Sequence, residues 1–90
     1  MPYQHRSSDA NEVAYNKRFT QRIKTRRQKS GYTAEKMAFR LGIKETQYAK
    51  YESRSPMSLY LLEKFAYVTK TDLHYLVTGF ERGILDSVDK

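Results

Sequence analysis

Apolar residues recur at helical spacing along most of the chain, and short polar or glycine-containing segments separate these runs. Tyr15, Phe19 and Ile23 follow one another at four-residue intervals, which predicts a first helix. Asp9 and Glu12 can form a capping pair at its start. The Lys-Ser-Gly segment at residues 29–31 ends it.

The following segment predicts two short helices joined by a glycine turn. Thr33 is a suitable N-cap for the first of them, and Gly42 ends it. The core face of that helix comprises Met37, Ala38 and Leu41. The second helix covers about residues 44–52. Its inner face carries Tyr48 and Tyr51, which we expect to pack rather than to stack on bases.

Two more helices follow a turn at residues 53–57. Ser58 caps the fourth helix, and its predicted inner face comprises Leu59, Leu62, Phe65, Ala66 and Thr69. Asp72 starts the fifth helix, and Gly79 follows it. The predicted inner face of that helix comprises Leu73, Leu76 and Val77. Strand signals are weak, so the pattern predicts an all-α domain of five short helices.

The two ends of the chain differ from this helical domain. Residues 1–8 are polar and predict a disordered arm, and the domain itself covers residues 9–79. Residues 80–90 form a tail with apolar residues at helical spacing, namely Phe80, Ile84, Leu85 and Val88. We expect a short extra helix there that serves as a dimer interface. The alternative is that Phe80 and Leu85 fold back onto the core.

The composition restricts the classes of protein that this chain can belong to. Its 90 residues allow one small domain, and the absence of cysteine excludes disulfides and thiolate chemistry. His5 and His74 lie far apart, so we predict no metal site and no cofactor. No apolar run approaches the roughly 20 residues of a membrane span, and no hydrophobic signal region begins the chain. We therefore expect a soluble, cytoplasmic protein that does not act on membranes.

The charge is concentrated at one end of the chain. The net charge is +7, of which residues 1–30 carry +6, residues 31–60 carry +2 and residues 61–90 carry −1. A basic field at one end indicates a polyanionic partner, most often a nucleic acid. No nucleophile–base set and no glycine-rich phosphate loop accompanies it, which argues against an enzyme.

The helix–turn–helix segment at residues 33–52 is the part that carries recognisable chemistry. A small residue such as Ala38 lets the second helix cross closely, and Gly42 permits the turn. With Tyr48 as the inward reference, the second helix exposes Glu45, Thr46, Gln47 and Lys50. These residue types can bond the cytosine amino group, the thymine methyl group, adenine and guanine, respectively. Glu45 has a second explanation, because an acid in the first turn also interacts well with the helix dipole.

The segment RIKTRRQKSGYTAEKMAFRLGIKETQYAKYE, followed by SLYLLEKFAYVTKTDLHYLVTG, resembles the lambda-repressor-like, or Xre-type, helix-turn-helix family. The matching parts are Arg27, T-x-x-x-M-A-x-x-L-G-I, Y-x-x-Y-E, S-L-x-x-L-x-x-F-A and D-L-x-x-L-x-T-G, over about residues 22–79. The resemblance implies a five-helix fold and sequence-specific binding of double-stranded DNA, usually as a homodimer. It also implies a bacterial or phage-encoded protein that acts at the nucleoid.

The resemblance also assigns roles to individual residues. It places Glu45, Thr46 and Lys50 in base-reading positions, with Gln47 beside them, and Thr33, Lys44, Arg54 and Ser55 at candidate phosphate contacts. Arg22 and Lys24 are further phosphate candidates from the first helix. Arg27 and Glu52 match a structural ion pair between that helix and the recognition helix. The chain departs from the family at Ala34, Lys44 and Lys70, where glutamine, serine or threonine, and glycine are usual.

These observations lead to two functional hypotheses. The first is a DNA-binding transcriptional regulator that acts as a repressor. The second is an antitoxin or adaptor that uses the same fold mainly to bind another protein, such as a toxin or a second regulator. RNA is a poorer partner, because the A-form major groove is too narrow for a recognition helix.

Overall fold

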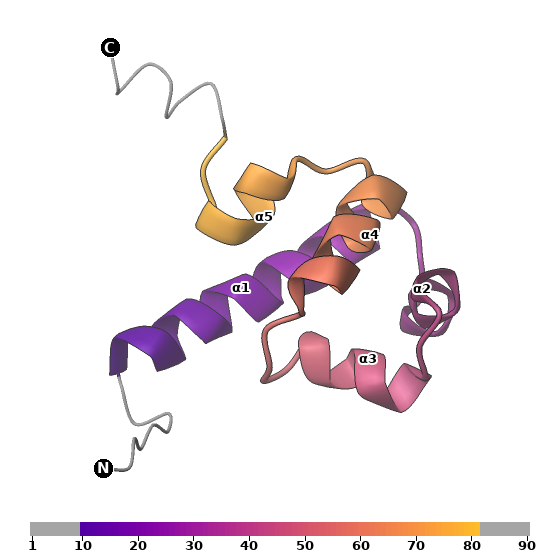
Figure 1. Ribbon diagram of the computed structural model, residues 1–90, viewed down its shortest axis with the longest axis horizontal. Helices are drawn as coiled ribbons and strands as arrows, with labels where there is room; N and C mark the ends of the chain where they lie inside the picture. The colour runs from indigo at the N-terminus through magenta and orange to yellow at the C-terminus, as the bar shows by residue number, and fades with distance from the viewer. Residues whose placement is uncertain (1–9, 82–90) are drawn as a thin grey trace.

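The computed structural model describes residues 10–81, which form five helices and contain no strand. In chain order these helices are α1 (Ala10–Lys29), α2 (Ala34–Leu41), α3 (Glu45–Tyr51), α4 (Leu59–Thr69) and α5 (Leu73–Thr78). Figure 1 shows the long α1 running along the molecule, with α4 and α5 near one side of it and the pair α2 and α3 beyond α4. The predicted all-α, five-helix fold is confirmed.

Side-chain caps start three of these helices at the residues that the sequence predicted. Thr33 Oγ1 accepts a hydrogen bond from the Lys36 amide at 3.1 Å. Ser58 and Asp72 accept equivalent bonds at the starts of α4 and α5. Gly42 and Gly79 end α2 and α5 in the left-handed conformation, with φ of 77° and 83°.

Lys70 ends α4 in the same left-handed conformation, with φ of 56°. It is the one residue other than glycine with positive φ between residues 10 and 81. The next amide, that of Thr71, donates to the Ala66 carbonyl at 2.9 Å. The α4–α5 turn therefore has the geometry of a glycine cap but carries a lysine.

The core draws on all five helices. Its fully enclosed side chains, each less than 2 % exposed, are Ile23, Met37, Leu41, Tyr48, Leu62, Phe65 and Leu76. Phe19, Ala38, Ala66 and Thr69 are also buried, as the sequence pattern predicted. Tyr15, Tyr51 and Val77 pack against this core from half-buried positions. The core thus lies where α1, α4 and α5 meet the α2–α3 pair.

Two residues of the predicted inner faces lie outside the core, and this is a correction. Leu59 is 75 % exposed and Leu73 is 37 % exposed. Each is the first residue of its helix, and helical side chains point toward the N-terminus, so both project beyond the end of the helix. Met57 and Leu61 are buried instead, at 5 % and 8 % exposure.

Two side chains of α1 bind the last carbonyls of α5. The Tyr15 hydroxyl donates to the Val77 carbonyl at 2.7 Å. Arg22 donates from Nε to the Leu76 carbonyl and from Nη2 to the Val77 carbonyl, both at 3.0 Å. Its guanidinium also lies 5.9 Å from the ring centres of Tyr15 and Phe19. These contacts fix α5 against α1.

Several sequence predictions fall outside the described residues. They are the polar arm at residues 1–8, the cap at Asp9, and the tail residues Ile84, Leu85 and Val88. Phe80 is described, and 55 % of its surface is exposed. Among residues 10–81, no helix has both the length and the apolar character that crossing a membrane requires.

Candidate nucleic-acid interface

The α2–α3 pair is built so that one face of α3 is buried and the opposite face is open. Ala38 is 2 % exposed, and Gly42 takes the left-handed conformation that the turn needs. Tyr48, on the inner face of α3, is fully buried. The residues predicted to read bases, Glu45, Thr46, Gln47 and Lys50, are all exposed on this helix. The structure thus brings the four together on one short helix, which Figure 1 shows at the edge of the fold.

Three of these four side chains are free to contact a ligand. Glu45, Thr46 and Lys50 form no side-chain hydrogen bond or ion pair with any residue between 10 and 81. Gln47 donates from Nε2 to the Tyr51 hydroxyl at 3.3 Å. Gln47 therefore has a preferred orientation before any ligand arrives.

A largely enclosed ion pair holds α3 against the end of α1. Arg27 and Glu52 form two hydrogen bonds, Nε to Oε2 at 2.6 Å and Nη2 to Oε1 at 3.1 Å. Arg27 Nη1 donates to the Tyr32 carbonyl at 2.8 Å, and the Tyr48 hydroxyl donates to Glu52 Oε2. The two charged side chains are only 12 % and 11 % exposed. This network fixes the position of α3 through its buried side, which is opposite its open face.

The network also changes two proton equilibria. The hydrogen bond with Glu52 raises the pKa of Arg27 above its ordinary value. Burial of the ring, followed by the hydrogen bond to Glu52, raises the pKa of Tyr48 well above its ordinary value of about 10. Arg27 therefore stays charged and Tyr48 stays neutral throughout the physiological range.

We expect the Tyr48 hydroxyl to make the fold sensitive to alkaline pH. The pKa of Tyr48 is higher in the folded protein than in the unfolded chain, so the unfolded chain releases this proton first as the pH rises above about 10. The folded state then loses about 1.4 kcal/mol of stability per pH unit through this group. Urea unfolding between pH 9 and pH 11 measures this effect. The free energy of unfolding of the wild type should approach that of Tyr48→Phe as the pH rises, because phenylalanine has no proton to lose. Parallel stability curves would contradict the assignment.

The candidate phosphate contacts are spread over several elements. Lys44 is exposed and precedes α3 without a side-chain cap bond. Lys24 is exposed on α1, and Thr33 is exposed at the start of α2, where its hydroxyl already accepts the Lys36 amide. Ser55 is half-buried, and its amide donates to the Lys50 carbonyl at 2.9 Å. Lys24, Lys44 and Arg54 are thus the charged members of this group with exposed side chains.

Arg22 has partners that the sequence did not indicate. Its guanidinium binds the last carbonyls of α5 and lies beside two rings of α1. These carbonyls are 54 and 55 residues away in the chain, so no local pattern could reveal the contact. Arg22 thus has a structural role between α1 and α5, and its predicted contact with a phosphate stays a prediction.

The structure instead brings a different basic residue of α1 beside Arg54. A hollow of about 410 Å³ lies between the first half of α1 and the turn after α3, lined by Val13, Asn16, Lys17, Ser53 and Arg54. Lys17 and Arg54 are both exposed. The sequence showed Lys17 only as one of many basic residues in the first helix. Its position next to the α3 turn depends on tertiary packing.

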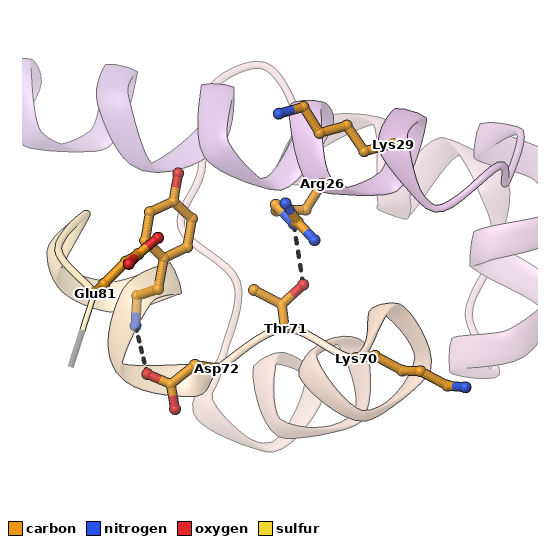
Figure 2. A pocket seen from close by; sticks show the side chains of 7 residues that line it. Arg26, Lys29, Lys70, Thr71, Asp72 and Glu81 are labelled. Atoms are coloured by element: carbon orange, nitrogen blue, oxygen red, sulfur yellow. Dashed lines mark hydrogen bonds between the residues drawn. The ribbon is translucent and has the colours of Figure 1, made fainter. Parts of the chain in front are cut away.

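A larger hollow, of about 690 Å³, lies between the end of α1 and the α4–α5 turn. Figure 2 shows Arg26 reaching toward Thr71, with the Lys70 side chain pointing away from it. Arg26 Nε donates to Thr71 Oγ1 at 3.1 Å, and Asp72 accepts the Tyr75 amide. Asp72 and Glu81 bring negative charge to the same hollow. None of the predicted site residues lines it.

Comparison with known protein families gives a match. A family model described as helix-turn-helix matches residues 23–76, which is more than half of the chain. The match begins within α1, includes the α2–α3 pair and ends within α5. No curated protein and no solved structure matches the chain.

Proposed function

Because the chain belongs to the lambda-repressor-like, or Xre-type, helix-turn-helix family of DNA-binding regulators, we propose that it represses transcription by binding a specific site in double-stranded DNA. In this proposal α3 enters the major groove, and the protein acts in the cytoplasm of a bacterium, at the nucleoid. The observation that carries the proposal is the open face of α3, which presents four polar side chains. The Arg27–Glu52 ion pair fixes the opposite side of this helix against the fold.

The dimensions and chemistry of α3 suit the major groove. That groove is about 12 Å wide and admits one helix, and each base pair presents a distinct donor and acceptor pattern in it. Lys50 is proposed to bind the guanine acceptors and Thr46 the thymine methyl group. Gln47 is proposed to bind adenine, and Glu45 the cytosine amino group. The free side chains of Glu45, Thr46 and Lys50 support this assignment.

Contacts to the DNA backbone are proposed on both sides of α3. Thr33 and Lys44 precede it, and Arg54 and Ser55 follow it. Lys17 joins Arg54 at the hollow beside the first half of α1. Lys24, exposed on α1, is proposed as a further contact. These residues orient the protein on the duplex, while the residues of α3 carry the sequence preference.

Selection of duplexes from a random pool tests the function directly. We expect a short enriched motif and an affinity that falls steeply as salt rises, because phosphate contacts release counterions. Recovery of no motif, together with no binding at low salt, would overturn the proposal. That result would favour the adaptor hypothesis, in which the same fold binds another protein.

We expect Lys50→Ala to weaken binding to the selected site and to relax the preference at one base pair. The loss should be about 1–3 kcal/mol if Lys50 bonds a guanine edge. Competition assays against every single-base variant of the site measure both effects. Lys29→Ala, an exposed lysine at the end of α1, is the matched control. An equal loss on specific and random duplexes would show that Lys50 contacts a phosphate instead.

We also propose a homodimer that forms through the tail. One recognition helix contacts few base pairs, and two half-sites one helical turn apart, about 34 Å, are the usual arrangement. The exposed Phe80 supports this proposal, and the apolar spacing continues at Ile84, Leu85 and Val88. Sedimentation should show a dimer for the full chain and a monomer for a chain that ends at Gly79. Equal association of the two chains would exclude the tail as the interface.

A further inference from the structure

The outer faces of α2 and α4 form an aromatic surface that the DNA-binding proposal does not use. Phe39 on α2 and Tyr67 on α4 are each 81 % exposed. Two hollows of about 430 Å³ each lie between these helices, and both reach Arg40, Tyr67 and Val68. A third, of about 490 Å³, adjoins them on the α2 side. We call this surface the α2–α4 patch, and its members are Tyr32, Phe39, Arg40, Lys64, Tyr67 and Val68.

Two cations of the α2–α4 patch are held in place by the fold. Arg40 Nη1 donates to the Tyr32 hydroxyl at 3.0 Å, and its guanidinium lies 5.7 Å from the centre of that ring. Lys64 Nζ donates to the Leu41 carbonyl at 3.2 Å and lies 5.2 Å from the centre of the Tyr60 ring. Neither cation has a carboxylate partner among residues 10–81. Both therefore present positive charge beside exposed rings.

The charge around the patch restricts what can cover it. Four cations, Lys36, Arg40, Lys64 and Lys70, line the three hollows, against two carboxylates, Glu35 and Glu63. A symmetric contact between two copies would bring these cations against one another, which is unfavourable. The phosphates of a nucleic acid would meet this positive charge but would leave the exposed Phe39 ring and Val68 without an apolar partner. A protein surface with both apolar and acidic groups complements the rings and the cations together.

We propose that the α2–α4 patch docks an acidic, amphipathic helix of a partner protein. The two hollows between α2 and α4 accept the apolar side of such a helix against Tyr67 and Val68, and the adjoining hollow on the α2 side extends this contact to Phe39. Carboxylates on the flank of the helix pair with Arg40 and Lys64. Arginine beside exposed aromatic rings is the composition of binding hot spots. This inference does not depend on the DNA-binding role.

A selection from random displayed peptides of about 16 residues tests the proposal, with the full chain as the immobilised target. We expect enriched peptides to be acidic and to repeat apolar residues at helical spacing. Phe39→Ala combined with Tyr67→Ala should weaken their binding at least about tenfold, and Arg40→Gln should weaken it further. Because these side chains are exposed, the variants should keep the wild-type melting temperature.

Leu59→Ala is the matched control, because Leu59 is 75 % exposed on α4 and lines none of the three hollows. It should leave peptide binding unchanged within about twofold. Peptides that bind the double variant as well as the wild type, or no enriched peptide at all, would overturn the proposal. Loss of dimerisation in the double variant would instead identify a second copy as the occupant. Loss of DNA or single-strand binding would identify a nucleic acid.

Discussion

Replacing Glu52 with alanine should lower the free energy of unfolding by about 3–5 kcal/mol. The substitution leaves the largely enclosed Arg27 guanidinium without its carboxylate and removes the acceptor of the Tyr48 hydroxyl. An unpaired buried charge costs more than the ion pair contributes, so the loss should exceed that of a surface pair. For a domain with a total stability of about 5–15 kcal/mol, this is a large fraction. Urea unfolding followed by circular dichroism measures it.

A double-mutant cycle with Arg27→Ala shows whether the two residues act together. Each single variant strands one charge, so the double variant should be less destabilised than the two single losses added together. Glu45→Ala is the control, because Glu45 is an exposed carboxylate on α3. It should change the free energy of unfolding by less than about 0.5 kcal/mol. Additive losses from the two single variants would show that Arg27 and Glu52 are not coupled in solution.

Replacing Arg22 with alanine should lower the free energy of unfolding by about 2–3 kcal/mol. Two charge-assisted hydrogen bonds to the Leu76 and Val77 carbonyls are lost, and so is the packing of the guanidinium beside Tyr15 and Phe19. Arg18→Ala is the matched control, because Arg18 is an exposed arginine four residues earlier on α1. The melting temperature of Arg22→Ala should lie several degrees below that of Arg18→Ala.

The same variant distinguishes a structural role for Arg22 from a phosphate contact. The salt dependence of DNA binding should have the same slope for Arg22→Ala as for the wild type. Arg54→Ala should reduce that slope by about one unit, as expected for a lost phosphate contact. If Arg22→Ala reduces the slope of the salt dependence and leaves the free energy of unfolding unchanged, Arg22 contacts a phosphate of the DNA.

Local signals were sufficient to predict the helices. Thr33, Ser58 and Asp72 start helices with side-chain caps, and Gly42 and Gly79 end them, because these interactions involve residues only a few positions apart. Helical spacing likewise identified most of the core. It failed at Leu59 because residues 59–62 are apolar or aromatic on several sides and do not define one inner face, and because Leu59 is the first residue of its helix.

The candidate site was predictable only where it lies on one helix. The open face of α3 follows from the rotation of its residues about Tyr48, and the structure exposes the four residues that this rotation selected. The partners of Arg22 and the approach of Lys17 to Arg54 depend on how α1 packs against distant segments. Spacing along the chain contains no information about such contacts. The α2–α4 patch was missed for the same reason, since only packing brings Arg40 of α2 beside Tyr67 and Val68 of α4.

The left-handed backbone of Lys70 makes the α4–α5 turn a site for protein engineering. A residue with a Cβ atom in this conformation costs about 1–2 kcal/mol relative to its preferred backbone. The lysine charge at the C-terminal end of α4 offsets only about 0.3–1 kcal/mol of this through the helix dipole. A net cost therefore remains at Lys70, and it lowers the free energy of unfolding of the domain. Thermostability can be adjusted at this turn without changing any side chain on α3.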